Sequence, residues 1–342
     1  MASFVPRQVF PRLDSLPRSY FLGHHRAGLN KMKNMLSYID LVIECRDYRV
    51  PLTSRNPLFE AELAGRQRLI LYTKQDLGSD SRREQKSSEK IVQEIERPTA
   101  VLFSDHRDKA SIQRVLTFVR DHTIGRDTLS GSRMMVVGMP NVGKSSLLNA
   151  LRHVSLRKGK AARTGDQPGV TRKIGTTVKI IEGDEDSAGV YMVDTPGVFI
   201  PYIPNSESML KLALCGSVKD SIIDPITLAD YLLFCLNQYD PEVYAQYSSP
   251  TNDIQRLLEA IAQKIGRLQR GGVPDLDATA VWIIQRWRTG HLGHFTLDNL
   301  TEEGIAAGDR DRQGVGSSLS QGRKLEKTFR AQRGNLQAMN SR

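Results

Sequence analysis

The sequence predicts an α/β fold with a doubly wound, mostly parallel sheet, followed by a small all-helical domain. Three observations predict this. Short apolar or β-branched runs recur through the first 200 residues, charged stretches of helix length separate several of them, and the pattern becomes helical after residue 205. Strands buried on both faces of a parallel sheet appear as short apolar runs, and their alternation with helices implies right-handed crossovers.

The individual elements follow from this pattern in chain order. We expect strands over Ile39–Glu44, Leu69–Tyr72, Ala100–Phe103, Met134–Val137 and Val190–Val193. Helices are expected first over Ser81–Arg97, Ser111–His122 and Ser146–Leu151, and then over Leu210–Ser221, Ile226–Leu236, Asp253–Gln269 and Asp277–Arg286. The sequence therefore predicts an α/β domain over residues 31–204 and a helical domain over residues 205–302.

Both ends of the chain are basic. Residues 1–30 are rich in arginine and poor in acids, as in a mitochondrial targeting sequence. However, Pro6, Pro11 and Pro17 would interrupt the amphipathic helix that such a signal needs, so a docking arm for nucleic acid is an equal alternative. Residues 303–342 are polar, basic and rich in glycine and serine, and we expect a disordered tail there.

Composition excludes several classes of protein. The 342 residues carry a net charge of +10, which favours a polyanionic partner such as nucleic acid or an acidic membrane surface. Three cysteines lie far apart with no CxxC pair, so a disulfide framework or a structural zinc site is not expected. No uncharged apolar run approaches the roughly 18 residues that an integral membrane span needs.

A phosphate-binding loop is the strongest motif. The segment 138–145 fits G-x-x-x-x-G-K-S and lies between a predicted strand and a predicted helix, which is the context that the motif requires. Its glycines turn backbone N–H groups toward phosphates, Lys144 contacts the β- and γ-phosphates, and the Ser145 hydroxyl binds Mg²⁺. The residues expected around the phosphates are Asn141, Val142, Gly143, Lys144, Ser145 and Ser146.

Two further segments point to a magnesium-dependent switch. Asp194-Thr195-Pro196-Gly197 directly follows the last predicted strand, so Asp194 would hold Mg²⁺ and the Gly197 N–H would sense a γ-phosphate. Between this motif and the phosphate loop, Thr171 follows Pro168-Gly169-Val170. Its hydroxyl is expected to complete the magnesium shell only when a γ-phosphate is present.

Thr73-Lys74-Gln75-Asp76 is a variant of the N-K-x-D motif that selects guanine. Guanine offers donors at N1 and N2, and the Asp76 carboxylate would accept both. Thr73 replaces the usual asparagine, and Lys74 would lay its aliphatic stem across the base. A backbone N–H at Ser104 would meet guanine O6, although Ser104-Asp105 departs from the usual Ser-Ala.

The order of these motifs is inverted. The base motif precedes the phosphate loop, whereas it follows the loop in Ras-like GTPases, so the sequence predicts a circular permutation. On this order and on five blocks, the chain over roughly residues 18–290 resembles the circularly permuted ribosome-assembly GTPases, above all their mitochondrial members. The blocks are Tyr20-Phe21-Leu22-Gly23-His24, Asp40-Leu41-Val42-Ile43-Glu44-Cys45-Arg46-Asp47, Arg49-Val50-Pro51, Asn56-Pro57 and the phosphate loop.

The resemblance implies a function. It implies hydrolysis of GTP with Mg²⁺, as a switch in assembly of the mitochondrial large ribosomal subunit and in contact with its rRNA. It also implies peripheral association with the matrix face of the inner membrane. A nucleotide-gated RNA-binding scaffold without hydrolysis and a membrane-associated signalling GTPase are the alternatives.

The hydrolytic machinery departs from that of Ras-like enzymes. The position that would orient the attacking water with a glutamine is Val198, and a hydrocarbon cannot do so. In the resembling family, the asparagine that matches Asn141 helps to hold K⁺, and the histidine that matches His24 is proposed to replace the glutamine. An Asx turn at Asn141 and a capping or packing role for His24 are the alternatives.

Together with Lys144 and Thr171, Asn141 and His24 are the catalytic candidates. His24 is expected on a loop. Its neighbour His25 lies outside the matched block, and its substitution is expected to reduce hydrolysis much less than substitution of His24.

Overall fold

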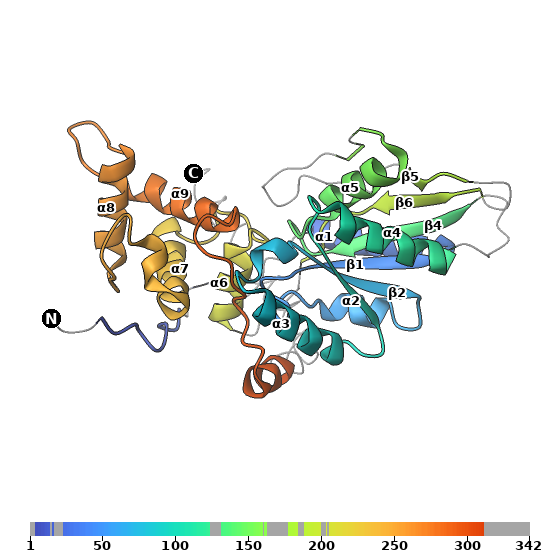
Figure 1. The fold of residues 1–342 in the computed structure, drawn as a ribbon, viewed down its shortest axis with the longest axis horizontal. Coiled ribbons are helices and arrows are strands. Elements are labelled where there is room, and N and C mark those ends of the chain that lie inside the picture. Colours follow the sequence, from blue (N-terminus) through green and yellow to red (C-terminus); the bar gives the residue numbers. More distant parts are fainter. Residues whose placement is uncertain are drawn as a thin grey trace, which may run out of the picture.

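The computed structural model of the chain describes residues 4–13, 16, 23–123, 131–159, 161–162, 177–183, 188–199, 203 and 205–310. Its centre is a six-stranded sheet of order β3-β2-β1-β4-β6-β5 (Figure 1). The strands are β1 (Leu41–Asp47), β2 (Arg68–Thr73), β3 (Ala100–Ser104), β4 (Ser132–Gly138), β5 (Val178–Ile181) and β6 (Val190–Asp194). All neighbours pair in parallel except β5, which is antiparallel to β6 at one edge.

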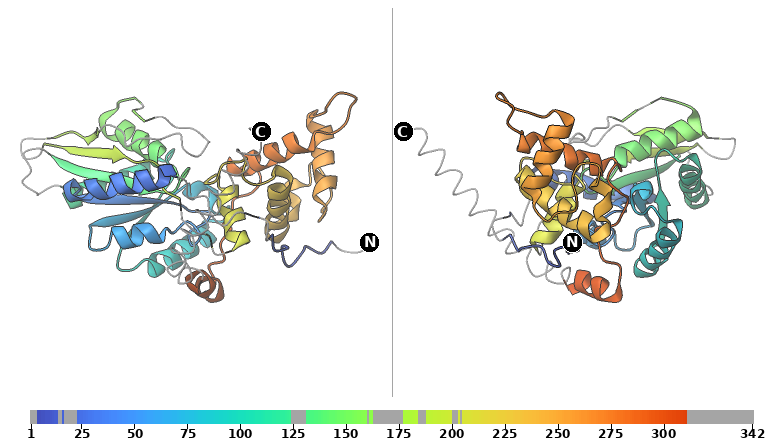
Figure 2. Two further views of the ribbon diagram at one scale, coloured as in Figure 1. Left: turned by 180° about the vertical axis from the view of Figure 1, so that it is seen from behind. Right: turned by 60° about the vertical axis from the view of Figure 1, so that its left-hand side comes forward.

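Helices cover both faces of the sheet. One face carries α1 (Gly23–Met35), α2 (Pro57–Glu62) and α3 (Arg82–Ile95), and the other carries α4 (Lys109–Thr123) and α5 (Lys144–Leu156). Figure 1 shows α4 in front of the strands, and the reverse view in Figure 2 shows α1 crossing the opposite face. Alternate residues of each strand bury against these two layers, as the apolar runs predicted.

The five predicted strands are present, and the predicted α/β class is confirmed. The structure adds α1, which was not predicted and which takes residues 23–30 out of the predicted N-terminal arm. Leu29 and Met32 of α1 are buried beneath Val42 and Met135 of the sheet. This apolar stripe was hidden in the sequence because exposed arginine and lysine side chains lie between its members.

A helical region lies at one end of the sheet domain (Figure 1). It consists of α6 (Ser206–Leu214), α7 (Pro225–Tyr239), α8 (Ile254–Ile265) and α9 (Leu276–Arg288). Asp224, Asp253 and Asp275 begin the last three helices, where each side chain accepts hydrogen bonds from N–H groups of the first turn. The region shares a continuous apolar core with the sheet domain.

The described part of the N-terminal arm packs on this helical region. Arg7 forms an ion pair with Asp230 of α7 at 2.7 Å, and Phe10 meets the ring of Tyr231 edge to face at 5.1 Å. In Figure 1 the N-terminal segment accordingly runs beside α7.

The segment after α9 returns to the sheet domain. Leu297 N donates to Arg49 O at 2.7 Å, and the buried Asp298 carboxylate accepts from Leu52 N and Thr53 N. Residues 302–310 then form a further helix whose Gly308 lies against Leu52. The prediction of disorder from residue 303 is therefore wrong for residues 303–310, because this part of the tail docks on the sheet domain. The rest of the tail lies outside the described residues.

Across the described part of the chain, no helix combines the length and the apolar character needed to cross a bilayer.

Candidate nucleotide-binding site

The predicted motifs converge at the carboxyl edge of the sheet. From the centre, the chain winds outward through β1, β2 and β3 on one side and through β4 and β6 on the other, so the switch point of the topology lies between β1 and β4. Ligands of doubly wound sheets bind at this point. Thr73, Ser104, Gly138 and Asp194 each end one of the strands at this edge.

The phosphate loop connects β4 to α5 in a conformation that depends on its glycines. Gly138 has φ +148°, and a Cβ there would lie 2.4 Å from the Cys45 carbonyl oxygen of the adjacent strand. The Lys144 ammonium, at the start of α5, donates to Met139 O at 2.7 Å. Burial lowers the pKa of Lys144, and the nearby Asp194 opposes this shift. The lysine thus lies inside the loop, where a negative ligand would hold its charge.

A hydroxyl and a carboxylate form a pair beside the loop. Ser145 Oγ donates to Asp194 Oδ2 at 2.7 Å. Asp194 is 5% exposed, and its Oδ1 has no hydrogen-bond partner among the described residues. Burial raises the pKa of Asp194, against the effects of Ser145 and Lys144.

This pair fits Mg²⁺, which takes oxygen ligands and is bound by one or two protein groups together with phosphates and water. The described residues contain no cluster of three or more His, Cys, Asp or Glu that would hold a metal without phosphates. The predicted third ligand, Thr171, lies outside the described residues.

The D-T-P-G loop presses against the phosphate loop. A Cβ on Gly197 would lie 2.6 Å from Pro140 Cα, and Val198 N donates to Gly138 O at 3.1 Å. The Val198 side chain is 2% exposed and belongs to the core under α1. It is therefore fixed in the apolar interior and, as its chemistry predicted, does not supply a water-orienting group.

His25 makes a contact with the D-T-P-G segment that the sequence did not predict. This histidine of α1 is 2% exposed, and its Nδ1 lies 3.0 Å from Gly197 O and 3.4 Å from Phe199 N. His24 lies in the first turn of α1 rather than on a loop, and its side chain is outside the described set. His25 therefore touches the D-T-P-G segment itself, and its substitution would remove this contact.

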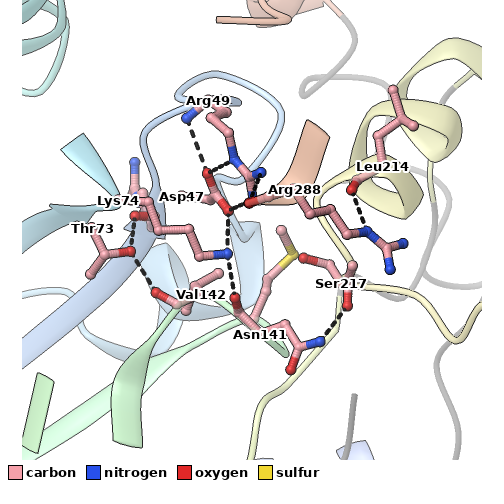
Figure 3. Close-up of polar contacts among 12 residues, drawn as sticks. Asp47, Arg49, Thr73, Lys74, Asn141, Val142, Leu214, Ser217 and Arg288 are labelled. Carbon is pink, nitrogen blue, oxygen red and sulfur yellow. Dashed lines mark hydrogen bonds and ion pairs between the residues drawn. The ribbon is translucent and has the colours of Figure 1, made fainter. Parts of the chain in front are cut away.

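The base motif is joined to the phosphate loop. Thr73 Oγ1 donates to Val142 O at 2.5 Å, and Lys74 Nζ donates to Asn141 O at 2.7 Å (Figure 3). Ser104 is buried and pairs in register with Thr73. The threonine that replaces the usual asparagine thus binds the loop through its hydroxyl.

Asp76 lies in a short 3₁₀ turn, η2 (Gln75–Leu77), directly after β2 and Lys74. The carboxyl group is half-buried, and burial raises its pKa, with Asp105 contributing in the same direction. Asp105 stands where Ser-Ala motifs carry alanine. A second carboxylate therefore acts on Asp76, which residue spacing did not predict.

The helical region contacts the phosphate loop directly. Asn141 adopts φ +58°, and its Nδ2 donates to Gly216 O at 2.8 Å. Ser217 Oγ donates to Pro140 O at 3.0 Å. Gly216 and Ser217 closely follow α6, so the end of that helix is fastened to the loop.

The fold and these motifs define a P-loop GTPase whose guanine motif precedes its phosphate loop, that is, a circularly permuted one. The profile of the family described as 50S ribosome-binding GTPase matches residues 133–267. The GNP-bound crystal structure of YlqF from T. maritima is similar at a TM-score of 0.55 and 22% identity, over 79% of this chain and 97% of that one.

Curated relatives narrow the family. Mitochondrial GTPase 1 of Schizosaccharomyces pombe is 38% identical over 87% of this chain and 94% of its own length. Mitochondrial ribosome-associated GTPase 1 of Bos taurus is 35% identical over 88% of this chain and 94% of its own length. The chain belongs to the mitochondrial GTPase 1 family.

Proposed function

We propose that this protein hydrolyses GTP as a switch in assembly of the mitochondrial large ribosomal subunit. The observation that carries the proposal is the direct attachment of the helical region to the phosphate loop through Asn141 and Ser217. A nucleotide that reorders the loop would move the helical surface with it. The names of the relatives, which include mitochondrial ribosome-associated GTPases, support a mitochondrial ribosomal partner.

In this proposal the buried charges of the site hold the triphosphate. Lys144 contacts the β- and γ-phosphates, and Ser145 with Asp194 holds Mg²⁺. Thr171 and the Gly197 N–H respond to the γ-phosphate, so their segments order with GTP and relax after hydrolysis. Bound Mg²⁺ neutralises charge that develops on the phosphates.

Guanine is selected by the residues that follow β2 and β3. Asp76 accepts the N1–H and N2–H₂ donors, Lys74 covers the face of the base, and the Ser104 N–H meets O6. Support comes from the contact between the two motifs, since Lys74 of the base motif donates a hydrogen bond to Asn141 O of the phosphate loop. The raised pKa of Asp76 also fits a carboxylate that gains donors when a base binds.

Because Val198 is buried, the group that orients water has to come from elsewhere. We assign this role to His24, which lies one residue before the histidine that contacts Gly197 O. K⁺ near the phosphates, held by the Asn141 amide oxygen, would supply the charge of an arginine finger. The amide nitrogen is engaged by Gly216, so the oxygen is the ligand that the proposal uses.

We place the rRNA contact on the helical region. Its outer end exposes basic side chains along α8 and the following turn, namely Arg256, Lys264, Arg267 and Arg270. Such a surface, with the net charge of +10, suits phosphate backbones.

We also propose peripheral association with the matrix face of the inner membrane. RNase-insensitive membrane fractionation would instead support the signalling GTPase.

Phosphate release in the presence and absence of mitochondrial large subunits tests the enzymatic part of this proposal. We expect subunits to accelerate release, and K⁺ to support a higher rate than Na⁺ at equal ionic strength. Equal rates in the two salts would contradict the proposal that Asn141 holds a K⁺ ion near the phosphates. Nucleotide-dependent subunit binding without any release would identify the non-hydrolysing scaffold instead.

A further inference from the structure

A buried chain of polar groups runs from the guanine motif to α9 of the helical region. Lys74 Nζ pairs with Asp47 Oδ2 at 2.8 Å, and Asp47 pairs with Arg49 through Nε at 3.0 Å and Nη2 at 2.8 Å. The Arg49 guanidinium lies over the Trp287 indole, 4.8 Å from its centroid, and Nη1 reaches Arg288 O at 3.5 Å. Figure 3 shows Lys74, Asp47, Arg49 and Arg288 in succession.

The two central members of this polar group are charged and buried. Asp47 and Arg49 are 1% and 2% exposed. Burial opposes ionisation of Asp47, but Arg49 and Lys74 more than offset it and hold the pKa of that carboxyl well below its usual range. Removing one member of such a group leaves another charge buried and uncompensated. The position of the Lys74 ammonium therefore depends on how Asp47 and Arg49 are placed.

The same end of α9 also fixes the contacts on the phosphate loop. The Arg288 guanidinium donates to Leu214 O at 2.8 Å at the end of α6 and pairs with Asp220 at 2.7 Å. Gly216 and Ser217, which touch the phosphate loop, lie between these two partners in the chain. The end of α9 thus contacts Arg49, which leads to the guanine motif, and also the segment that binds the phosphate loop.

We propose that Asp47 and Arg49 are positioning residues that transmit the placement of α9 to Lys74, so that docking of the helical region sets guanine-nucleotide affinity. This proposal rests on the proposed GTP site and adds its regulation. Coupling between binding sites is reciprocal, so a partner that displaces α9 changes nucleotide affinity, and nucleotide changes affinity for that partner by the same factor.

The test compares three conservative changes in the full chain. Arg49→Lys keeps the charge but loses the fork that pairs with Asp47 and lies over Trp287. Trp287→Leu acts from the helical region, and Trp287→Phe retains an aromatic face and is expected to restore the wild-type value. The control is Arg46→Lys, in the strand β1 that precedes Arg49, since Arg46 is 1% exposed and pairs with Glu44 at 2.6 Å.

We expect Arg49→Lys and Trp287→Leu each to raise the dissociation constant for GDP roughly fivefold to tenfold, at the lower end of ordinary coupling between sites. Arg46→Lys is expected to lower the unfolding temperature while leaving that constant within about twofold of wild type, because Arg46 pairs with Glu44 and Glu96 and not with Lys74, Asp47 or Arg49. Unchanged GDP affinity in Arg49→Lys and Trp287→Leu, or an equal rise in Arg46→Lys, would overturn the link. Failure of the wild-type chain to bind GDP would overturn the proposed GTP site as well.

Discussion

Asp76→Asn is expected to exchange the preference for guanine nucleotides for a preference for xanthine nucleotides. The amide nitrogen would face guanine donors, whereas the oxygen that xanthine carries at position 2 accepts from it. Such a mismatch costs about 1–3 kcal/mol, and more in a buried site. That range corresponds to roughly five- to 150-fold in the ratio of dissociation constants. Competition between GDP and xanthosine diphosphate for the purified protein measures it.

Asp105→Asn is the matched control for this exchange. It alters the second carboxylate near the base without altering the one that accepts guanine donors, so guanine preference should persist. Because Asp105 helps burial to raise the pKa of Asp76, the carboxylate protonates at a higher pH than an isolated aspartate. Guanine affinity is therefore lost as pH falls, and Asp105→Asn should move that loss to lower pH. A strong GTP preference in Asp76→Asn would contradict the base-site assignment.

His24→Ala is expected to keep GTP affinity and subunit binding but to lose most of the subunit-stimulated hydrolysis. A positioned acid–base group contributes roughly 10²–10⁴-fold to a rate. The reason to expect it here is that Val198 is buried, while the first turn of α1 lies beside the D-T-P-G loop through His25 and Gly197. Single-turnover phosphate release on large subunits provides the rate.

Arg26→Ala supplies the control for His24, since Arg26 lies on the same helix and is exposed. Its rate is expected to match wild type. His25→Ala is a different experiment: it removes a buried contact to Gly197 O and should reduce the free energy of unfolding by about 1–3 kcal/mol. If His24→Ala hydrolyses GTP on the subunit at the wild-type rate, His24 has no catalytic role and the segment around it serves only as an anchor.

The sheet could be predicted because burial on both faces leaves a mark in the sequence. Leu69–Tyr72 and Met134–Val137 are uninterrupted apolar runs, and each lies inside a strand. The edge strand β5 is different, because Lys179 interrupts it and no strand of the described residues pairs with its outer side. Helix α1 was not predicted for a related reason, since its exposed basic residues mask the pattern of the buried Leu29 and Met32.

Some parts of the nucleotide site could likewise be predicted from the sequence, and others could not. Segments that are contiguous in sequence, such as the phosphate loop and Asp194-Thr195-Pro196-Gly197, carry their own signature. Contacts between distant segments leave no such signature in the sequence, because their acceptors are backbone carbonyl groups, which every residue has. Asn141 meets Gly216 O and His25 meets Gly197 O across 75 and 172 residues. No pattern in the sequence marks either acceptor, so the attachment of the helical region to the phosphate loop emerges only from the fold.

The most direct test of the central claim is sedimentation of the protein with mitochondrial large subunits in two nucleotide states. The account predicts that the protein travels with the large subunit in a non-hydrolysable GTP analogue and stays at the top of the gradient in GDP. Equal association in the two states, or none in either, would contradict the role of this GTPase as a nucleotide-driven switch on the subunit.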